Sequence, residues 1–194
     1  MKKKTFTTKK LVLTALLAAL TVAGSALRIT MPLSIAGTTS FHLGNILCAL
    51  SGILLGPWFG GLAAGMGSAI YDMTNPLFIS ECWITFITKG IYGLVVGLIT
   101  WRRKTAWEAE GKGSYIRLYI ATVAGALSYA VLYLSKGFLY DGLLLGGLPA
   151  KAAMINIVGK LPATVFNAAV AIVCAPLLAI AVSKALKKAR LTLD

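Results

Sequence analysis

Six apolar stretches fill most of the 194-residue chain, and this pattern excludes an ordinary water-soluble fold. Hydrophobic residues make up 58% of the chain and charged residues 13%, whereas soluble domains average about 45–50% and about 25%. Because so few polar groups cannot cover this apolar surface in water, the lipid bilayer must be the solvent for most of the chain. The sequence therefore predicts an all-α membrane protein in which residues 1–194 form a single integral-membrane domain.

The six stretches predict six transmembrane helices, and the segments between them predict loops. The helices are expected at residues 11–29, 42–55, 59–73, 82–101, 115–137 and 150–186, with a glycine-rich outer loop at 138–149. At about 1.5 Å per residue, the second and third helices are only about 21–23 Å long. They are therefore short spans or a re-entrant hairpin, and the sequence leaves both readings open.

Basic residues cluster beside the apolar stretches, at residues 2–10, 102–117 and 184–190. This is the pattern of cytoplasmic loops, so both chain ends and the central loop should face the cytoplasm. The net charge of +13 therefore reflects membrane orientation, and nucleic acid is not an expected partner. The first apolar stretch also imitates a cleavable signal peptide, but an uncleaved helix is favoured because the rest of the chain is membrane-embedded.

The chain has no motif for ATP binding or for catalysis. The phosphate-binding loop of ATPases requires Gly-Lys followed by Ser or Thr, and neither Gly111-Lys112 nor Gly159-Lys160 continues in this way. One histidine and no paired catalytic carboxylates argue against an enzyme. The cysteines are widely spaced, so neither a disulfide framework nor a metal or cofactor site is predicted. Any energy for transport would have to come from a partner.

Polar side chains inside the apolar stretches form the main candidate binding site, because each is costly in lipid and needs an explanation. Residues at helical spacing place them on shared faces of three helices. Aromatic faces for stacking, amides for directional hydrogen bonds, and lysines for an anionic group or a carbonyl suit a flat polar ligand. The candidates are Trp83, Lys89 and Tyr92; Tyr129, Tyr133 and Lys136; and Asn156, Lys160 and Asn167.

Simpler explanations exist for some of these residues. Lys136 lies near a helix end and could extend to water, and Tyr129 and Tyr133 could belong to an interfacial aromatic belt. Lys160 lies about ten residues inside its span, so we expect it to be functional or paired. Asp72 is the partner that the sequence suggests for it.

A second group of candidates is expected at the outer ends of the second and third helices. His42 and Asn45 open the second helix, while Asp72 and Asn75 close the third, so all four could line one mouth. One histidine and one carboxylate do not predict a metal site, which usually needs three or four protein ligands. Glu81, near Trp83, is either a ligand contact or an interfacial cap.

Small residues at four-residue spacing form two stripes that allow close approach of helices. Ala15, Ala19 and Ala23 form one stripe, and Gly61 and Gly65 form the other. Packing within the chain explains either stripe, and an interface with another membrane subunit is the alternative.

Taken together, the chain resembles the substrate-binding S components of energy-coupling-factor (ECF) vitamin transporters. The resemblance rests on chain size, the six helices with both ends inside, TALLAA at residues 14–19, FHLGN at 41–45, and the stretch from there through LGP at 55–57 to Asp72. It implies a six-helix bundle in a prokaryotic plasma membrane that binds a vitamin near the outer face, beneath the loop joining helices 1 and 2.

The resemblance also implies partners: a transmembrane coupling subunit and two cytosolic ATPase subunits, whose ATP hydrolysis topples the S component and releases the substrate inside. Ala15 and Ala19 match the family's docking motif. Metal-specific relatives carry a histidine at position two, where this chain has Lys2, so nickel and cobalt are not expected.

The substrate stays open at this stage. Riboflavin and pyridoxine- or hydroxymethylpyrimidine-like precursors are favoured, and folate and queuosine precursors remain alternatives. Two other functions also remain: a stand-alone proton-coupled carrier that uses Asp72 or Glu81, and a non-transporting membrane assembly protein.

Overall fold

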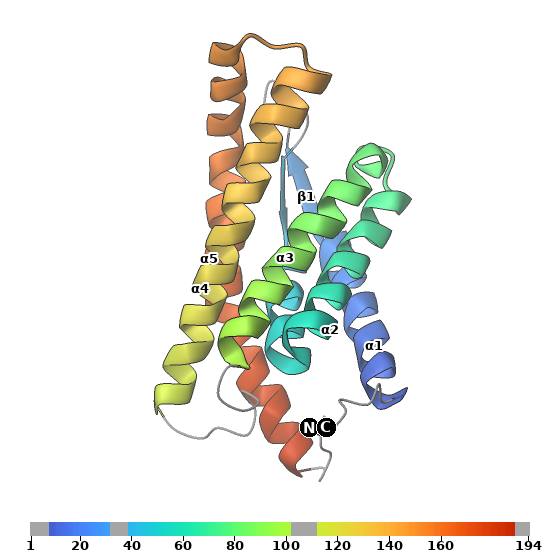
Figure 1. Ribbon diagram of the computed structural model, residues 1–194, viewed down its shortest axis with the longest axis vertical. Helices are drawn as coiled ribbons and strands as arrows, with labels where there is room; N and C mark the ends of the chain where they lie inside the picture. The colour runs from blue at the N-terminus through green and yellow to red at the C-terminus, as the bar shows by residue number, and fades with distance from the viewer. Residues whose placement is uncertain (1–7, 32–38, 102–111, 189–194) are drawn as a thin grey trace, which may run out of the picture.

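A computed structural model of the protein describes residues 8–31, 39–101 and 112–188. These residues form a bundle of long helices with one short β-hairpin beside it (Figure 1). Within the described residues, five helices are long and apolar enough to cross a membrane. They are α1 Thr8–Ala26, α2 Gly44–Thr74, α3 Cys82–Thr100, α4 Lys112–Lys136, which continues into the π-helix η2 Gly137–Leu145, and α5 Ala150–Lys188. The basic segment at 102–111 lies outside the described residues.

The helix α2 is two antiparallel segments rather than one rod. Its backbone leaves the helical conformation at Gly56, where φ is +79°, and Pro57 follows. Beyond this point the chain folds back, so that the Cys48 Sγ lies 3.6 Å from the Ser68 Oγ. Segments 44–55 and 57–74 correspond to the second and third helices predicted from the sequence. Six complete membrane spans remain a prediction.

The turn at Gly56 is stabilised by the end of α3. Pro57 has no N–H, so the Ile53 carbonyl four residues earlier loses its helical partner. The indole Nε1 of Trp101 donates to that carbonyl at 3.1 Å. A Cβ atom on Gly56 would lie only 2.7 Å from the same indole ring. Glycine is therefore required here by both the positive φ and the close approach of Trp101.

The two small-residue stripes have different environments. A Cβ on Gly61 would lie 2.8 Å from the Gly90 carbonyl oxygen, and one on Gly65 would lie 2.7 Å from that of Phe86. The glycine stripe therefore packs α2 against α3. The side chains of the alanine stripe, at Ala15, Ala19 and Ala23, are exposed, because α1 turns its opposite face toward α2.

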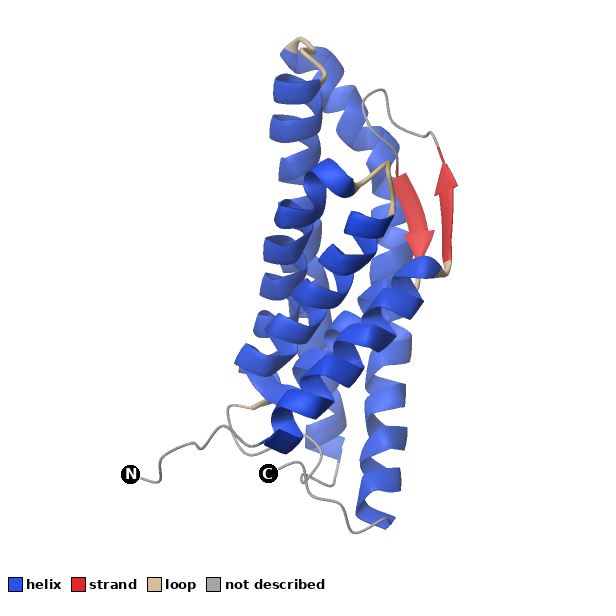
Figure 2. Ribbon diagram, turned by 90° about the vertical axis from the view of Figure 1, so that its right-hand side faces the viewer, coloured by secondary structure: helices blue, strands red, loops and turns tan. Residues whose placement is uncertain are grey.

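A β-hairpin replaces part of what the sequence predicted as helix and loop. Strand β1 Arg28–Met31 pairs antiparallel with β2 Thr39–His42, so the first helix ends at Ala26 rather than at residue 29. His42 accordingly ends a strand and does not open a helix. Figure 2 shows the hairpin against one side of the bundle, toward the end away from the start of α1.

The side chain of Asn167 on α5 explains why β2 is stable as an edge strand. Its Oδ1 accepts from the His42 N–H at 2.9 Å, and its Nδ2 donates to the Ser40 carbonyl at 2.8 Å. The amide thus satisfies the backbone groups that β1 does not reach.

The prediction of an outer loop at residues 138–149 is also wrong in part. The chain continues from α4 into η2, and a loop follows only at residues 146–149. A π-helix hydrogen-bonds from i to i+5 and is common at functional sites. This segment places Asp141 inside the bundle, which a solvated loop would not do.

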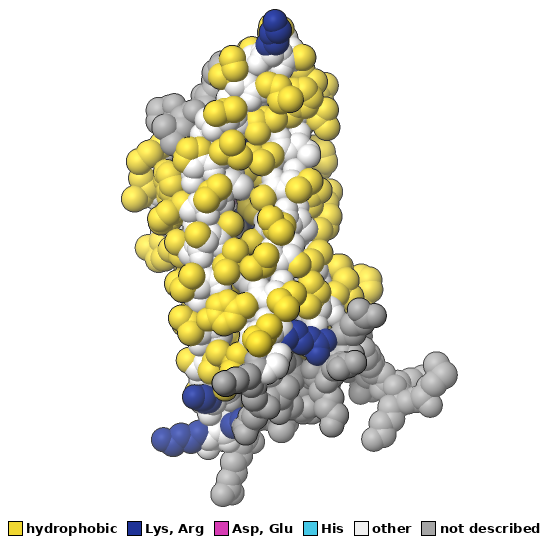
Figure 3. Space-filling model, turned by 90° about the vertical axis from the view of Figure 1, so that its left-hand side faces the viewer, with side chains coloured by type: hydrophobic (Ala, Val, Ile, Leu, Met, Phe, Trp, Pro, Cys, Tyr) yellow, Lys and Arg dark blue, Asp and Glu magenta, His cyan; other side chains and the backbone are white. Residues whose placement is uncertain are grey.

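The surface fits a lipid environment. Figure 3 shows hydrophobic side chains over most of the visible face, with Lys and Arg side chains near its ends. The start of α1 and the end of α5 lie at one end of the bundle (Figure 1), as the predicted topology requires. The chain is a multi-pass membrane protein, and the cytoplasmic location of its ends remains a prediction.

Candidate functional site

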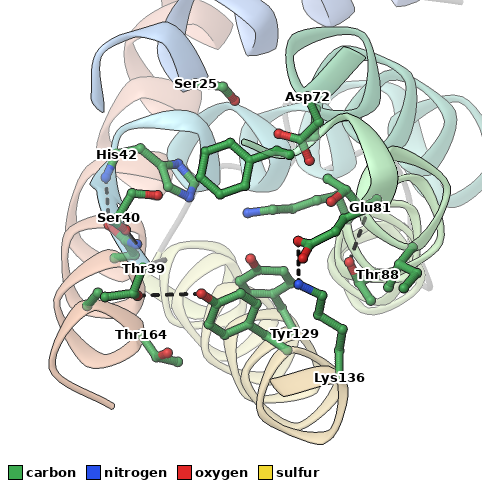
Figure 4. A pocket seen from close by; sticks show the side chains of 18 of the residues that line it. Ser25, Thr39, Ser40, His42, Asp72, Glu81, Thr88, Tyr129, Lys136 and Thr164 are labelled. Carbon is green, nitrogen blue, oxygen red and sulfur yellow. Dashed lines mark hydrogen bonds and ion pairs between the residues drawn. The ribbon is translucent and has the colours of Figure 1, made fainter. Parts of the chain in front are cut away.

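A polar cavity lies between the β-hairpin and the helices, and both strands, the short helix η1 Ile79–Glu81 and the five long helices contribute residues to its wall (Figure 4). Candidates from the sequence that line it are His42, Asp72, Lys89, Tyr129, Tyr133, Lys136 and Asn167. Further lining residues include Arg28, Glu81, Thr39, Thr88 and Thr164. A hydrogen-bonding cavity inside an apolar bundle is the type of site that binds a polar small molecule.

Three tyrosines form a stacked column at this cavity. The Tyr92 and Tyr129 rings are 5.8 Å apart and inclined by 22°, and the Tyr129 and Tyr133 rings are 5.7 Å apart and inclined by 25°. Tyr129 and Tyr133 are one turn apart on α4, so both face the cavity, while Tyr92 on α3 lies behind them. The Tyr133 hydroxyl lies 3.4 Å from the Thr39 Oγ1. The column offers an aromatic face on which a planar ligand can stack.

Lys89 approaches the same column from α3. Its ammonium donates a hydrogen bond to the Asn45 side-chain oxygen and lies 3.8 Å from the centre of the Tyr129 ring. The side chain is buried, and it lines the cavity. Asn45 therefore supports Lys89 from behind and is not itself part of the wall.

A network of charges joins α4, α5 and the two short helices at this end of the bundle. Asp141 forms ion pairs with Lys160 and with Lys136, whose Nζ lies 3.0 Å from the Asp141 Oδ1. Lys136 also pairs with Glu81, the last residue of the 3₁₀ helix η1 Ile79–Glu81. The expected pairing of Lys160 with Asp72 is therefore wrong. Lys136 is held by carboxylates rather than extended to water.

Asp72 instead faces Arg28 at the start of the hairpin, with 3.9 Å between the closest charged atoms. The Arg28 guanidinium also lies 4.5 Å from the Tyr71 ring centre and 4.6 Å from that of Phe78. These contacts attach β1 to the end of α2.

His42 is held as a neutral imidazole. Its Nδ1 accepts from the Gly44 N–H at 3.1 Å, so the ring hydrogen resides on Nε2. Burial, and then the charges of Lys89 and Arg28, lower the pKa of His42 well below its usual value. The imidazole is therefore uncharged at neutral pH.

The remaining candidates lie away from the cavity wall. Asn156 is buried and donates to the Gly137 carbonyl at 3.1 Å, and Lys160 lies behind the wall with Asp141. The Asn75 Oδ1 accepts from the Leu77 N–H at 3.0 Å and so shapes a turn. Trp83 is 57% exposed and packs edge-on against Tyr140. Asn156, Lys160 and Asn167 do share the buried face of α5, as their spacing predicted.

The sequence reasoning missed Arg28 and Asp141 and left Glu81 undecided. A charged residue inside an apolar stretch needs a partner, and this signal was present for both missed residues. Arg28 lies near the end of the first predicted helix, and Asp141 lies in a segment predicted as an outer loop, so neither position by itself indicated a buried charge.

Apolar helices that surround a polar, aromatic-lined cavity define a membrane protein built to bind a small molecule. A family model described as "ECF-type riboflavin transporter, S component" matches residues 5–187, and the chain belongs to this family. The resemblance seen in the sequence is thereby confirmed. The protein is a substrate-binding subunit of a vitamin transporter and functions with other ECF components.

Two relatives carry less specific descriptions. A "UPF0397 protein" from Streptococcus gordonii is 32% identical over 129 residues, which cover 66% of this chain and 67% of the relative. An uncharacterized protein from the gap 3' region of Pyrococcus woesei is 32% identical over 124 residues, which cover 64% of this chain and 74% of the relative. Neither description names a ligand.

Proposed function

We propose that the cavity binds a flat, polar vitamin or vitamin precursor, which the chain then delivers inward as part of an ECF transporter. The observation that carries this proposal is the Tyr129–Tyr133 stack, which lines a buried polar cavity beside Lys89. Stacking would hold a planar ring, and the surrounding amide, hydroxyl and ammonium groups would fix its orientation.

Riboflavin is the first substrate to test, because the matching family is described by that vitamin. Pyridoxine- and hydroxymethylpyrimidine-like precursors also have a flat heteroaromatic ring and remain favoured alternatives. Folate and queuosine precursors also fit an aromatic site with several hydrogen-bond donors and acceptors.

The proposal includes the partners and the membrane arrangement. The single domain would cross a prokaryotic plasma membrane six times, with both ends in the cytoplasm. A transmembrane coupling subunit carried by two cytosolic ATPases would dock on α1. Exposure of Ala15, Ala19 and Ala23 supports this docking, because no described helix of the chain covers the stripe.

Titration of the purified protein with riboflavin tests the binding site. Stacking quenches flavin fluorescence, so the dissociation constant can be read directly. Tyr133→Ala should weaken binding by about tenfold, which corresponds to about 1.4 kcal/mol. Tyr115→Ala, far from the cavity on α4, is the matched control. If Tyr133→Ala binds as tightly as the parent, the cavity is not the site.

Co-purification with the partner subunits tests docking. Ala19→Trp should abolish partner binding and leave riboflavin binding unchanged, whereas Leu20→Trp, at the next exposed position, should retain both.

Vesicle uptake distinguishes the carrier alternative. Transport by this chain alone, driven by a pH gradient, would contradict the dependence on partners; the pairing of Asp72 with Arg28 and of Glu81 with Lys136 argues against such a carrier.

A further inference from the structure

Lys89 differs from the other cations around the cavity in its contacts. Each of the others lies within 4 Å of a carboxylate: Arg28 with Asp72, Lys136 with Glu81 and Asp141, and Lys160 with Asp141. Lys89 has an amide oxygen and an aromatic ring as its contacts. In the part of the chain that the structure describes, no carboxylate lies within 4 Å of its ammonium.

An ammonium in this position is unfavourable in the ligand-free chain. Removing a charge from water carries a large desolvation cost, which a well-placed opposite charge can offset. One neutral amide and one ring face offset only part of it. Lys89 is 4% exposed, so water reaches little of the side chain. Around the cavity, the four described cations Arg28, Lys89, Lys136 and Lys160 face three carboxylates, Asp72, Glu81 and Asp141, so one positive charge has no counter-charge.

The position of Lys89 indicates where that anion would come from. Its ammonium is directly over Tyr129, and Tyr129 stacks on Tyr133, which also lines the cavity. Because Lys89, Tyr129 and Tyr133 line the same cavity, a ligand bound there can contact both the aromatic rings and the ammonium. Thr88, one residue earlier on α3, adds a hydroxyl to the same wall.

We propose that the ligand of this cavity carries an acidic group, whose negative charge binds the Lys89 ammonium while the ring stacks on the tyrosines. The inference rests on the proposed function and narrows its substrate class to anionic heterocycles. A carboxylate and a phosphate share this chemistry, and the experiment separates them.

Two pairs of flavins with one common ring system provide the test. In the first pair, lumiflavin is neutral, and 10-carboxymethylflavin carries a carboxymethyl group in place of the methyl group on N10. In the second pair, riboflavin is neutral, and flavin mononucleotide adds a phosphate. Binding to the full chain in lipid nanodiscs is followed by fluorescence quenching. At least one anionic flavin should bind about tenfold more tightly than its neutral counterpart, as expected for a charge-assisted contact. The pair that shows the larger gain in affinity identifies whether a carboxylate or a phosphate binds at Lys89.

Lysine variants assign the preference to one residue. Lys89→Met should reduce the ratio of anionic to neutral flavin affinity to near unity. Lys151→Met, at an exposed position near the start of α5, should retain the parent's ratio. Equal or weaker binding of both anionic flavins would overturn the acidic-ligand inference but leave the proposed function intact. Loss of the preference in Lys136→Met alone would also overturn it. Failure of all four flavins to bind would overturn the inference and exclude riboflavin as the substrate, while the non-flavin candidates of the proposed function would remain.

A second measurement does not depend on any ligand. Because Lys89 has no carboxylate partner, Lys89→Met in the ligand-free protein should melt at the parent's temperature or above it. Lys160→Met, which removes one of the two lysines paired with the buried Asp141 carboxylate, should melt at a lower temperature. If both variants lose stability equally, Lys89 is a structural residue and the inference fails.

Discussion

Two lysines in this bundle are both buried, but the groups that contact their ammonium ions differ. These contacts, rather than burial, distinguish a lysine that stabilises the fold from one that binds a ligand. Lys160 on α5 and Lys89 on α3 are 1% and 4% exposed. Lys160 is paired with Asp141, whereas Lys89 contacts an amide and a ring. The charge of Lys160 is balanced within the chain. The charge of Lys89 is balanced only when a ligand supplies a negative group.

The largest expected effect tests the Lys160 side of this comparison. Asp141→Asn removes the carboxylate shared by Lys160 and Lys136 and leaves a buried ammonium without a counter-charge. We expect a loss of about 3–5 kcal/mol in the free energy of unfolding. Denaturant titration in detergent, with helical circular dichroism as the signal, measures it.

A double variant provides the control for this prediction. Asp141→Leu combined with Lys160→Met removes both charges, so it should recover most of the stability that Asp141→Asn loses. A parent-like free energy of unfolding for Asp141→Asn would show that the ion pair contributes little and would remove the contrast with Lys89.

A smaller effect tests the Lys89 side. Asn45→Leu removes the amide oxygen that accepts from Lys89 and should cost the ligand-free protein about 1–2 kcal/mol. An anionic ligand should compensate, so the increase in melting temperature on adding 10-carboxymethylflavin should exceed that of the parent. Asn75→Leu, which affects a turn outside the cavity, should show the parent's increase. An equal increase for Asn45→Leu would mean that the ligand does not reach Lys89.

The smallest effect concerns His42, whose pKa is lowered by burial and by the Lys89 and Arg28 charges. The unfolded chain binds a proton on this histidine below pH 6.5, while the folded chain does not. His42 therefore gives full stability above about pH 6.5, and stability falls on acidification, by at most about 1.4 kcal/mol per pH unit. His42→Gln should flatten this dependence between pH 6.5 and 5.5 in thermal melts. The same slope in both proteins would contradict a neutral, buried imidazole.

Features set by local sequence could be predicted well. The apolar stretches locate the helices, and Gly56-Pro57 locates the reversal of α2, because both signals act on the segment that contains them. Spacing also placed Asn156, Lys160 and Asn167 on one buried face of α5.

Features that depend on distant partners could not be predicted. The strand β2 is only four residues long, and its free edge is satisfied by Asn167, 125 residues beyond His42 in the sequence. The partner of Lys160 was misassigned because Asp72 and Asp141 look equivalent in sequence. Only the packed bundle shows that the π-helical segment carries Asp141 to α5 and that Arg28 reaches Asp72.

The most direct test is a structure of the protein in lipid nanodiscs with 10-carboxymethylflavin bound. Our account predicts the flavin ring against Tyr129 or Tyr133, its carboxylate on the Lys89 ammonium, and the Lys160–Asp141 pair unchanged. A flavin bound elsewhere, with Lys89 still on Asn45, would contradict the account.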